Sequence, residues 1–312
     1  MNILVCGSLA YDRIMDFSGK FSEHILAGKT HILNLSFTVN GVKESFGGTG
    51  GNIAYNLALL GERPKIIAVA GKDFGRYQTW LKKNNLGVSG VKIVKNELTA
   101  SAYIMTDKAD NQITAFYPGS KIQTSPHPLL GKERGKGILA IIAPDIVARM
   151  TEYAKMFKRF KTAYIFDPGQ QITGYNASEL RYSISGAKAL IGNDYEIQLI
   201  LNKLKIKLKQ LEKMVEILII TKGGQGSEIY NLGKKIIIAP AKPKAILDPT
   251  GAGDAYRAGF IKGLIMGWPL EICGRLASLV AVYTVEKYGT QTHSFSWREM
   301  AKRYEENYNE NL

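Results

Sequence analysis

Short apolar runs alternate with amphipathic segments along most of the chain. Runs of consecutive apolar residues predict strands that are buried on both faces, because a half-exposed strand would alternate apolar and polar positions. These strands are expected at residues 2–6, 65–71, 138–144, 162–169, 187–193 and 216–224. The segments between them predict helices near residues 51–61, 73–85, 145–160, 194–211, 253–267 and 270–287. The repetition predicts a three-layer α/β/α fold with a mainly parallel central sheet.

Two stretches break this rhythm because their apolar and polar residues alternate. Residues 31–46 contain an Asn-Gly pair, and residues 99–117 contain Lys-Ala-Asp-Asn, both typical of turns. We expect two antiparallel hairpins that join residues 11–18 in a small sheet inserted in one domain, residues 1–312. Such a sheet is suited to close over a ligand as a lid, although ordinary surface hairpins show the same pattern. Residues 118–137, rich in Pro, Gly and Lys, are expected to form a surface connection.

The composition is that of an ordinary soluble globular protein. The chain has 312 residues, of which 45% are hydrophobic and 22% are charged. Its two cysteines, Cys6 and Cys273, lie far apart and fit a reducing compartment better than a disulfide scaffold. The first residues lack the pattern of a secretory signal, and no apolar stretch approaches the roughly 18 residues of a membrane helix. We therefore expect a cytoplasmic protein without a membrane partner.

The net charge of +14 leaves open whether the chain attracts an anionic ligand. The densest basic patch, residues 202–213, alternates lysines with apolar residues and lacks the interleaved aromatic residues of a nucleic-acid module. A solvated basic surface is the favoured interpretation, and a field that attracts a polyanionic small substrate is the alternative. No nucleic-acid partner is expected. The four histidines are scattered, and we expect most of them at the surface.

Glycines gather where strands are expected to lead into helices, which is where ligands bind in open α/β sheets. In "FGGTGGNIAYNLALLG", residues 46–61, four glycines precede an amphipathic helix, and Asn52 lies near its start. Glycine lets a backbone approach a ligand closely, but a tight turn with close helix packing explains the same cluster.

A second glycine-containing loop, "DPTGAGDAYRAGF" at residues 248–260, places small residues where a helix begins. Exposed N–H groups at a helix start bind anions, so this loop is suited to phosphate oxygens. Asp254 would repel such an anion unless it acts on the other reactant as a general base. The spacing alone leaves this role and a helix cap equally open. Walker A, G-x-G-x-x-G, H-E-x-x-H, paired-Cys and G-x-S-x-G motifs are absent.

Together these stretches resemble the ribokinase family, also called PfkB carbohydrate kinases, over nearly the whole chain. "DPTGAGDAYRAGF" and "GGTGGNIAYNLALLG" resemble the two signatures of the family. "GNDYE" at residues 192–196 is similar to its N-x-x-E element, and "ITKGGQGSEIY" at residues 220–230 to its T-x-G-x-x-G element. The resemblance implies a ribokinase-like core with a small β-sheet lid.

The resemblance also implies a kinase that transfers the ATP γ-phosphoryl group to a substrate hydroxyl. Asp254 is implied as the base, and the N–H groups of Gly251, Ala252, Gly253 and Asp254 as the anion hole. The implied cofactor sites are Asn193 and Glu196 for Mg²⁺ through water, Thr221, Gly223 and Gly226 for the nucleotide, and Asp248 for a monovalent cation such as K⁺. Residues implied to hold sugar hydroxyls are Asp12, Gly47, Gly48 and Asn52.

Within the family, "GSLAYDRIMDF" and "YGTQTHSF" resemble bacterial and archaeal adenosine and nucleoside kinases. The small sheet also offers an apolar wall for a purine ring, unless these residues pack its own core: Ile14, Met15, Phe17, Phe37 and Phe116. We therefore expect phosphorylation of the 5′-hydroxyl of a ribonucleoside, with adenosine as the leading candidate. A sugar or sugar-phosphate kinase is the alternative, and a non-catalytic nucleotide- or nucleic-acid-binding protein is the alternative of another class. The chain is expected to be a monomer or a homodimer formed through the lid.

Overall fold

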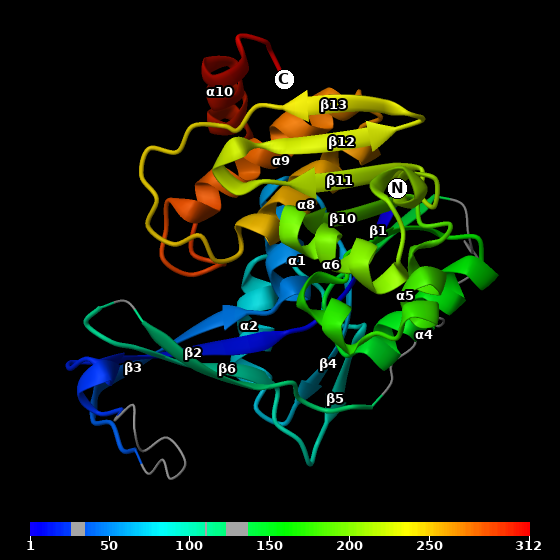
Figure 1. Ribbon diagram of the computed structural model, residues 1–312. Coiled ribbons are helices and arrows are strands. Elements are labelled where there is room, and N and C mark those ends of the chain that lie inside the picture. The colour runs from blue at the N-terminus through cyan, green and yellow to red at the C-terminus, as the bar shows by residue number, and fades with distance from the viewer. Residues whose placement is uncertain (26–34, 110, 123–136) are drawn as a thin grey trace.

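The computed structural model describes residues 1–25, 35–109, 111–122 and 137–312 (Figure 1). Within these ranges, nine strands form the main sheet in the order β13-β12-β11-β10-β9-β8-β1-β4-β5. They are β1 (Asn2–Cys6), β4 (Lys65–Gly71), β5 (Val91–Val94), β8 (Ile138–Ile142), β9 (Ala163–Phe166), β10 (Ala189–Asn193), β11 (Ile217–Thr221), β12 (Ser227–Asn231) and β13 (Lys234–Ile238). Neighbours from β5 to β11 are parallel, whereas β12 and β13 are antiparallel additions at one edge. The predicted mainly parallel sheet is confirmed.

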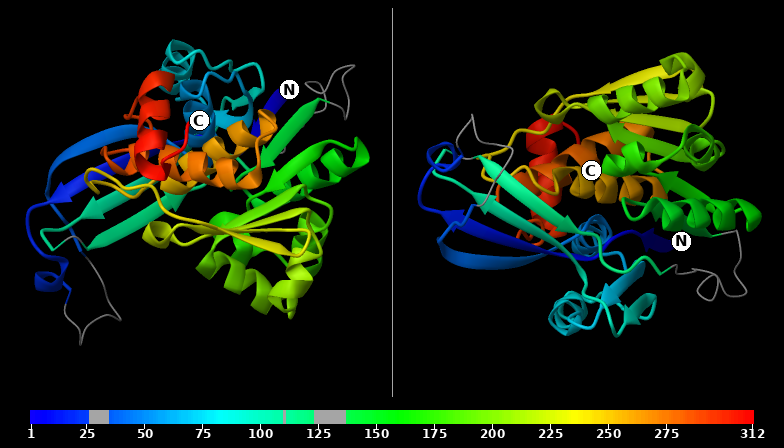
Figure 2. Two further views of the ribbon diagram at one scale, coloured as in Figure 1. Left: turned by 90° about the horizontal axis from the view of Figure 1, so that it is seen from above. Right: turned by 60° about the horizontal axis from the view of Figure 1, so that its bottom comes forward.

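Helices cover both faces of this sheet, as the two views in Figure 2 show. On one face lie α1 (Thr49–Leu59), α2 (Gly75–Lys83), α8 (Ala252–Ile265), α9 (Leu270–Val285) and α10 (Trp297–Tyr308). On the other lie α4 (Val147–Arg159), α5 (Ala177–Ile184), α6 (Asp194–Leu204) and α7 (Leu208–Glu212). No helix among the described residues has the length and apolarity to span a bilayer.

The consecutive apolar residues of the central strands follow from this double cover. In β1, Ile3 and Val5 pack under α1 and α8, while Leu4 and Cys6 pack under α4. Each of these four side chains is at most 3% exposed. Burying one such aliphatic side chain contributes about 1.5–3 kcal/mol, so both faces drive the strand into the core. The three-layer prediction is therefore confirmed.

A second, four-stranded sheet projects from the core in the order β3-β2-β6-β7 (Figure 1). Its strands are β2 (Ala10–Phe17), β3 (Val39–Gly47), β6 (Ala100–Thr106) and β7 (Gln112–Tyr117). The predicted hairpin in residues 99–117 is present as the antiparallel pair β6 and β7. We call this four-stranded unit the small sheet.

Two local predictions were wrong. Residues 35–46 do not form their own hairpin, because the Asn40-Gly41 pair lies inside β3, which pairs antiparallel with β2. The helix predicted over residues 194–211 is broken after α6, where Lys205 adopts a left-handed conformation with φ 52°. Residues 31–34 of the expected hairpin, and 123–136 of the expected surface connection, lie outside the described residues.

Candidate active site

Most of the predicted site residues gather at the carboxyl edge of the main sheet. Parallel strands bring their carboxyl ends to one edge, and the loops there lead into helices. Here β10 leads into α6, β11 into the glycine turn η4 (Gly223–Gln225), and the loop after residue 248 into α8. The small sheet meets this edge where β3 runs through Gly47 and Gly48 into α1.

Asp254 lies in the first turn of α8 and is 9% exposed. The N-cap of this helix is Gly251, and Asp254 accepts no cap hydrogen bond, so the helix-cap interpretation was wrong. Its Oδ2 instead accepts a hydrogen bond of 2.8 Å from Asn52 Nδ2 on α1. Burial raises the pKa of Asp254 to about 7, against the opposing effects of Arg257 and Asn52. The carboxyl group can therefore exchange a proton near neutral pH.

Asn52 was predicted to hold a sugar hydroxyl, but its side chain is 4% exposed and its polar atoms have protein partners. Its Oδ1 lies 2.8 Å from Thr290 Oγ1 and accepts from Gln291 Nε2 at 3.0 Å. Thr290 and Gln291 were not predicted as site residues. They lie in "YGTQTHSF", but nothing in that stretch marks them as partners of a residue 239 positions away.

A buried ion pair lies under the start of α8. Arg257 Nη2 donates to Asp167 Oδ1 at 2.8 Å, and Arg257 Nε forms an ion-pair contact with Asp167 Oδ2. The two residues are 8% and 0% exposed. Burial alone would lower the pKa of Arg257, but Asp167 outweighs it and holds that pKa above its ordinary value. The pair thus places a fixed positive charge beside Asp254, and the sequence analysis did not identify either residue.

Asp12 lies on the face of the small sheet from which its carboxylate approaches Asp248 and Asp254. Its carboxylate lies against Gly47, and burial raises its pKa to about 6, helped by the charge of Asp248. The β2–β6–β7 register places Phe116 on the same face of the sheet as Asp12, where it is 51% exposed. Ile14 shares this face because side chains two residues apart in a strand point the same way.

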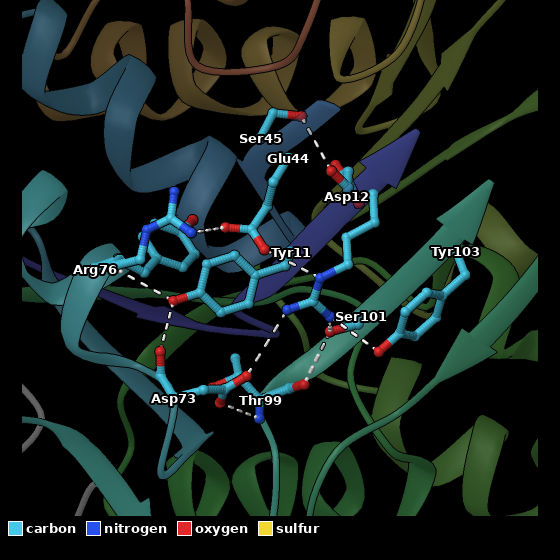
Figure 3. A network of polar contacts seen from close by, with 11 residues as sticks. Tyr11, Asp12, Glu44, Ser45, Asp73, Arg76, Thr99, Ser101 and Tyr103 are labelled. Carbon is cyan, nitrogen blue, oxygen red and sulfur yellow. Dashed lines mark hydrogen bonds and ion pairs between the residues drawn. The ribbon is translucent and has the colours of Figure 1, made fainter. Parts of the chain in front are cut away.

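The opposite face of the small sheet is fastened to the core by polar contacts around Arg13, the residue after Asp12. Figure 3 shows Glu44, Ser101 and Tyr103 of this sheet gathered with Asp73 and Arg76 from the start of α2. Arg13 donates to Glu44 at 3.0 Å and to Ser101 at 2.8 Å, and it lies 4.0 Å from Asp73. Because these contacts hold the Arg13 face of the small sheet in place, they also fix the orientation of the opposite face, which carries Asp12.

The apolar wall predicted on the small sheet is divided. Phe17 and Phe37 pack with Phe21 in an aromatic cluster whose ring centroids are 4.9–5.8 Å apart. Met15 alternates with Ile14 and so lies on the other face. For Phe17 and Phe37 the prediction was wrong, because they pack in this cluster, and Met15 does not share the face of Asp12. Ile14 and Phe116 remain on the face of Asp12.

A cavity of about 270 Å³ lies between η4 and the start of α8. Thr221, Gly223 and Gly226 line it, together with Ala252 and Gly253. Its opposite wall is apolar and consists of Ile246, Ala281, Val282 and Val285. The cavity thus combines an apolar slot, suited to a purine ring, with the helix start, suited to phosphate.

The sequence pattern of the family described as "pfkB family carbohydrate kinase" matches residues 5–297. The chain belongs to the PfkB family of carbohydrate kinases. This confirms the resemblance and identifies an ATP-dependent kinase with a ribokinase-like fold.

Similar proteins agree with this assignment. The chain is 32% identical over 310 residues to a nucleoside kinase of Methanothermobacter thermautotrophicus, covering 97% of this chain and 95% of that protein. Burkholderia thailandensis nucleoside kinase in complex with inosine has a TM-score of 0.85 and 34% identity, with 99% of each chain covered. The complex of that kinase with ADP-inosine has a TM-score of 0.83 and 35% identity, covering 99% of this chain and 97% of the other.

In this PfkB kinase, Asn193 and Glu196 form a reciprocal cap at the start of α6. Glu196 N donates to Asn193 Oδ1, and Asn193 N donates to Glu196 Oε2, both at 2.8 Å. No group of three His, Cys, Asp or Glu side chains within the described ranges is arranged to hold a metal. A Mg²⁺ ion here would therefore depend chiefly on phosphates and waters, with one carboxylate in support, as is common for this ion.

Asp248 joins the loop before α8 to the segment after α9. Its carboxylate accepts from the backbone N–H groups of Thr250 and Gly289, each at 2.9 Å. Burial would raise the pKa of Asp248, but these bonds outweigh it and hold the pKa below its ordinary value. Asp248 therefore stays ionised, as a cation ligand must.

The prediction that most histidines lie at the surface holds for His24 but not for His293. His24 is exposed, but His293 is 1% exposed, and burial lowers its pKa to about 4. His293 packs edge-on against Tyr55 and shares a hydrogen bond of 2.8 Å with Asn56, so it belongs to the core. His31 and His127 lie outside the described residues.

Proposed function

We propose that this kinase transfers the γ-phosphoryl group of ATP to the 5′-hydroxyl of a ribonucleoside, with adenosine as the leading candidate. The observation that carries the proposal is the placement of Asp254. It is a buried carboxylate in the first turn of α8, beside a cavity suited to a nucleotide and near Asp12 on the small sheet. The named relatives, and the inosine in one related structure, support a nucleoside as acceptor.

Asp254 acts as the general base in this proposal. The substrate hydroxyl lies between Asp254 and Asp12 and gives its proton to Asp254 as it attacks phosphorus. Asp12, with Gly47 and Gly48, positions the sugar. Asn52 joins them through the second N–H of its amide, because the first donates to the Asp254 carboxylate.

The start of α8 supplies the anion hole. Backbone N–H groups of Gly251, Ala252 and Gly253 face developing phosphate charge, which helix N-termini stabilise. The Ala252 N–H donates at 3.2 Å to Pro249 O, a long bond that a phosphate oxygen can replace. Arg257 adds positive charge under the same turn.

ATP and its cations have residues suited to them. Thr221, Gly223 and Gly226 border the nucleotide cavity, and ATP supplies the phosphoryl group there. Glu196 supports Mg²⁺ through water, and Asp248 holds a monovalent cation such as K⁺. We further propose that the small sheet acts as a lid, since Ile14 and Phe116 share the face from which Asp12 approaches Asp254.

The test is ADP release with adenosine, inosine, guanosine, cytidine, ribose and fructose 6-phosphate as acceptors. We expect turnover with purine nucleosides, and kcat/KM that rises with pH through about 7, because only ionised Asp254 accepts a proton. Asp254→Asn should lower kcat by roughly 10²–10⁴-fold. Activity with sugars alone would refute the nucleoside assignment, and near wild-type turnover by Asp254→Asn would refute the base.

A further inference from the structure

A chain of buried hydrogen bonds runs from α2 to Asp254. Trp80 Nε1 donates to Gln291 Oε1 at 3.0 Å, Gln291 Nε2 donates to Asn52 Oδ1 at 3.0 Å, and Asn52 Nδ2 donates to Asp254 at 2.8 Å. Gln291 is 2% exposed and Asn52 is 4% exposed. Because water has almost no access, the direction of each bond is set by its protein partners.

The indole of Trp80 fixes that direction. An indole N–H can only donate, whereas the two ends of a Gln or Asn amide are told apart by their partners. Gln291 must therefore turn its oxygen to Trp80 and its nitrogen to Asn52, and Asn52 must turn its own nitrogen to Asp254. Thr290 does not set the direction, because a hydroxyl can donate or accept.

The second N–H of Gln291 strengthens this arrangement. It donates to Tyr77 Oη at 2.6 Å, and Tyr77 donates in turn to the carbonyl of Gly47 at 2.8 Å, where β3 ends. Both donors and the acceptor of Gln291 are thus used. Turning the amide over would break all three bonds at once, so one orientation is strongly preferred.

The orientation of Asn52 matters because of the charges that face Asp254. Asn52 from α1 and Arg257 from α8 favour the carboxylate, whereas Asp12 from β2 and Asp167 after β9 oppose it. A donor stabilises the ionised carboxylate, and a carbonyl oxygen in its place would favour the protonated form. The orientation of the Asn52 amide therefore decides whether Asn52 favours the ionised or the protonated form of Asp254.

We propose that Gln291 is a positioning residue for phosphoryl transfer, which orients Asn52 so that Asp254 stays ionised and aligned with the attacking hydroxyl. This inference rests on the proposed role of Asp254 as base. It assigns Gln291 and Trp80 to the reaction although neither touches the reacting atoms.

The test compares Gln291→Met with Trp80→Phe, which removes the indole N–H together with the five-membered ring and keeps an aromatic ring at this position. For Gln291→Met we expect kcat to fall about 10- to 100-fold, the range for losing an oriented bond to a charged group. The acid limb of the kcat/KM profile should move to higher pH by about 1 pH unit, while KM for ATP stays nearly constant. Trp80→Phe should show the same changes at smaller size.

The matched control is Asn56→Leu, which removes another buried amide one turn along α1 without touching the side chain of Asn52. It should lower stability and leave the acid limb in place. If Gln291→Met and Trp80→Phe keep the wild-type acid limb, the inference is wrong, even if kcat falls. Asp254→Asn distinguishes a failure of this inference from a failure of the proposed base. If Asp254→Asn is inactive while the acid limb of Gln291→Met is unmoved, only the role of Gln291 is refuted.

Discussion

The Arg257–Asp167 pair allows a quantitative prediction, because removing Arg257 leaves a carboxylate that is 0% exposed without its counter-charge. Arg257→Met keeps most of the side-chain volume and deletes the charge. Breaking a buried pair in this way typically costs about 3–5 kcal/mol. Asp167 has one way to limit the penalty, which is to take up a proton.

The cost of that proton depends on pH in a calculable way. Unfolded Asp has a pKa of about 3.9, so keeping Asp167 protonated in the folded variant costs about 4 kcal/mol at pH 7 and about 2 kcal/mol at pH 5.5. In the variant, the pKa of Asp167 is higher in the folded protein than in the unfolded chain. The free-energy cost to folding is therefore absent below about pH 3.9 and grows as pH rises. For 312 residues, the average unfolding entropy converts these costs to a loss in Tm of about 6 °C and about 3 °C.

The assay is thermal unfolding of ligand-free wild type and Arg257→Met at pH 7 and pH 5.5. Asp167→Asn/Arg257→Met removes both charges and should show a smaller deficit that does not change with pH. Arg298→Met, at an exposed position on α10, controls for the loss of a surface cation. Burial raises the pKa of Asp167 and Arg257 opposes that rise, so losing Arg257 should raise this pKa further. Equal deficits at the two pH values in Arg257→Met would therefore refute the reasoning.

Two further substitutions test the nucleotide cavity and the small sheet. Gly226 has φ 87°, and a Cβ there would lie 2.1 Å from the carbonyl oxygen of Ile238, so Gly226→Ala should cost at least about 1–3 kcal/mol and raise KM for ATP. Gly224→Ala, with no atom within 4 Å of its Cβ, is the control, and equal thermal stability and KM in the two variants would contradict the prediction. Phe116→Ala should raise KM for the nucleoside about 3- to 10-fold, the range for one lost aromatic contact, without changing KM for ATP. Ile113→Ala, 43% exposed on the other face of β7, should leave both constants unchanged, and a nucleoside KM unchanged in Phe116→Ala would argue against a lid over the base.

The sequence predicted the layers of the fold because their signal is local. Residues 3–6 are consecutively apolar because two helix layers cover β1, and that requirement is visible in four adjacent residues of the sequence. The Asn40-Gly41 pair failed as a turn signal for the opposite reason. Pairing with β2, which is distant in sequence, outweighed the local preference and kept the pair inside β3.

The polar partners at the site could not be predicted in the same way. Asn52 meets Asp254 across 202 positions, and Arg257 meets Asp167 across 90. A hydrogen bond needs its atoms placed within a few tenths of an ångström, and no periodicity in a single sequence records that. The place of Asn52 near a helix start was predictable, but its bonds to Asp254, Thr290 and Gln291 were not.

The small residues in the loop before α8 show how a local sequence pattern can have two causes. In the proposed function, small residues there leave N–H groups open to phosphate. Gly253 also lacks a side chain for a second reason, because a Cβ would lie 2.6 Å from Arg257 Nη1. Helical side chains lean toward the N-terminus, so Arg257, four residues on, necessarily lies over Gly253. A cation at a helix start opposes the helix dipole, and Asp167 at the end of β9 compensates it. The glycine, the arginine and the aspartate therefore form one unit, in which the sheet edge supplies the charge that lets a guanidinium lie beneath the turn proposed to bind phosphate.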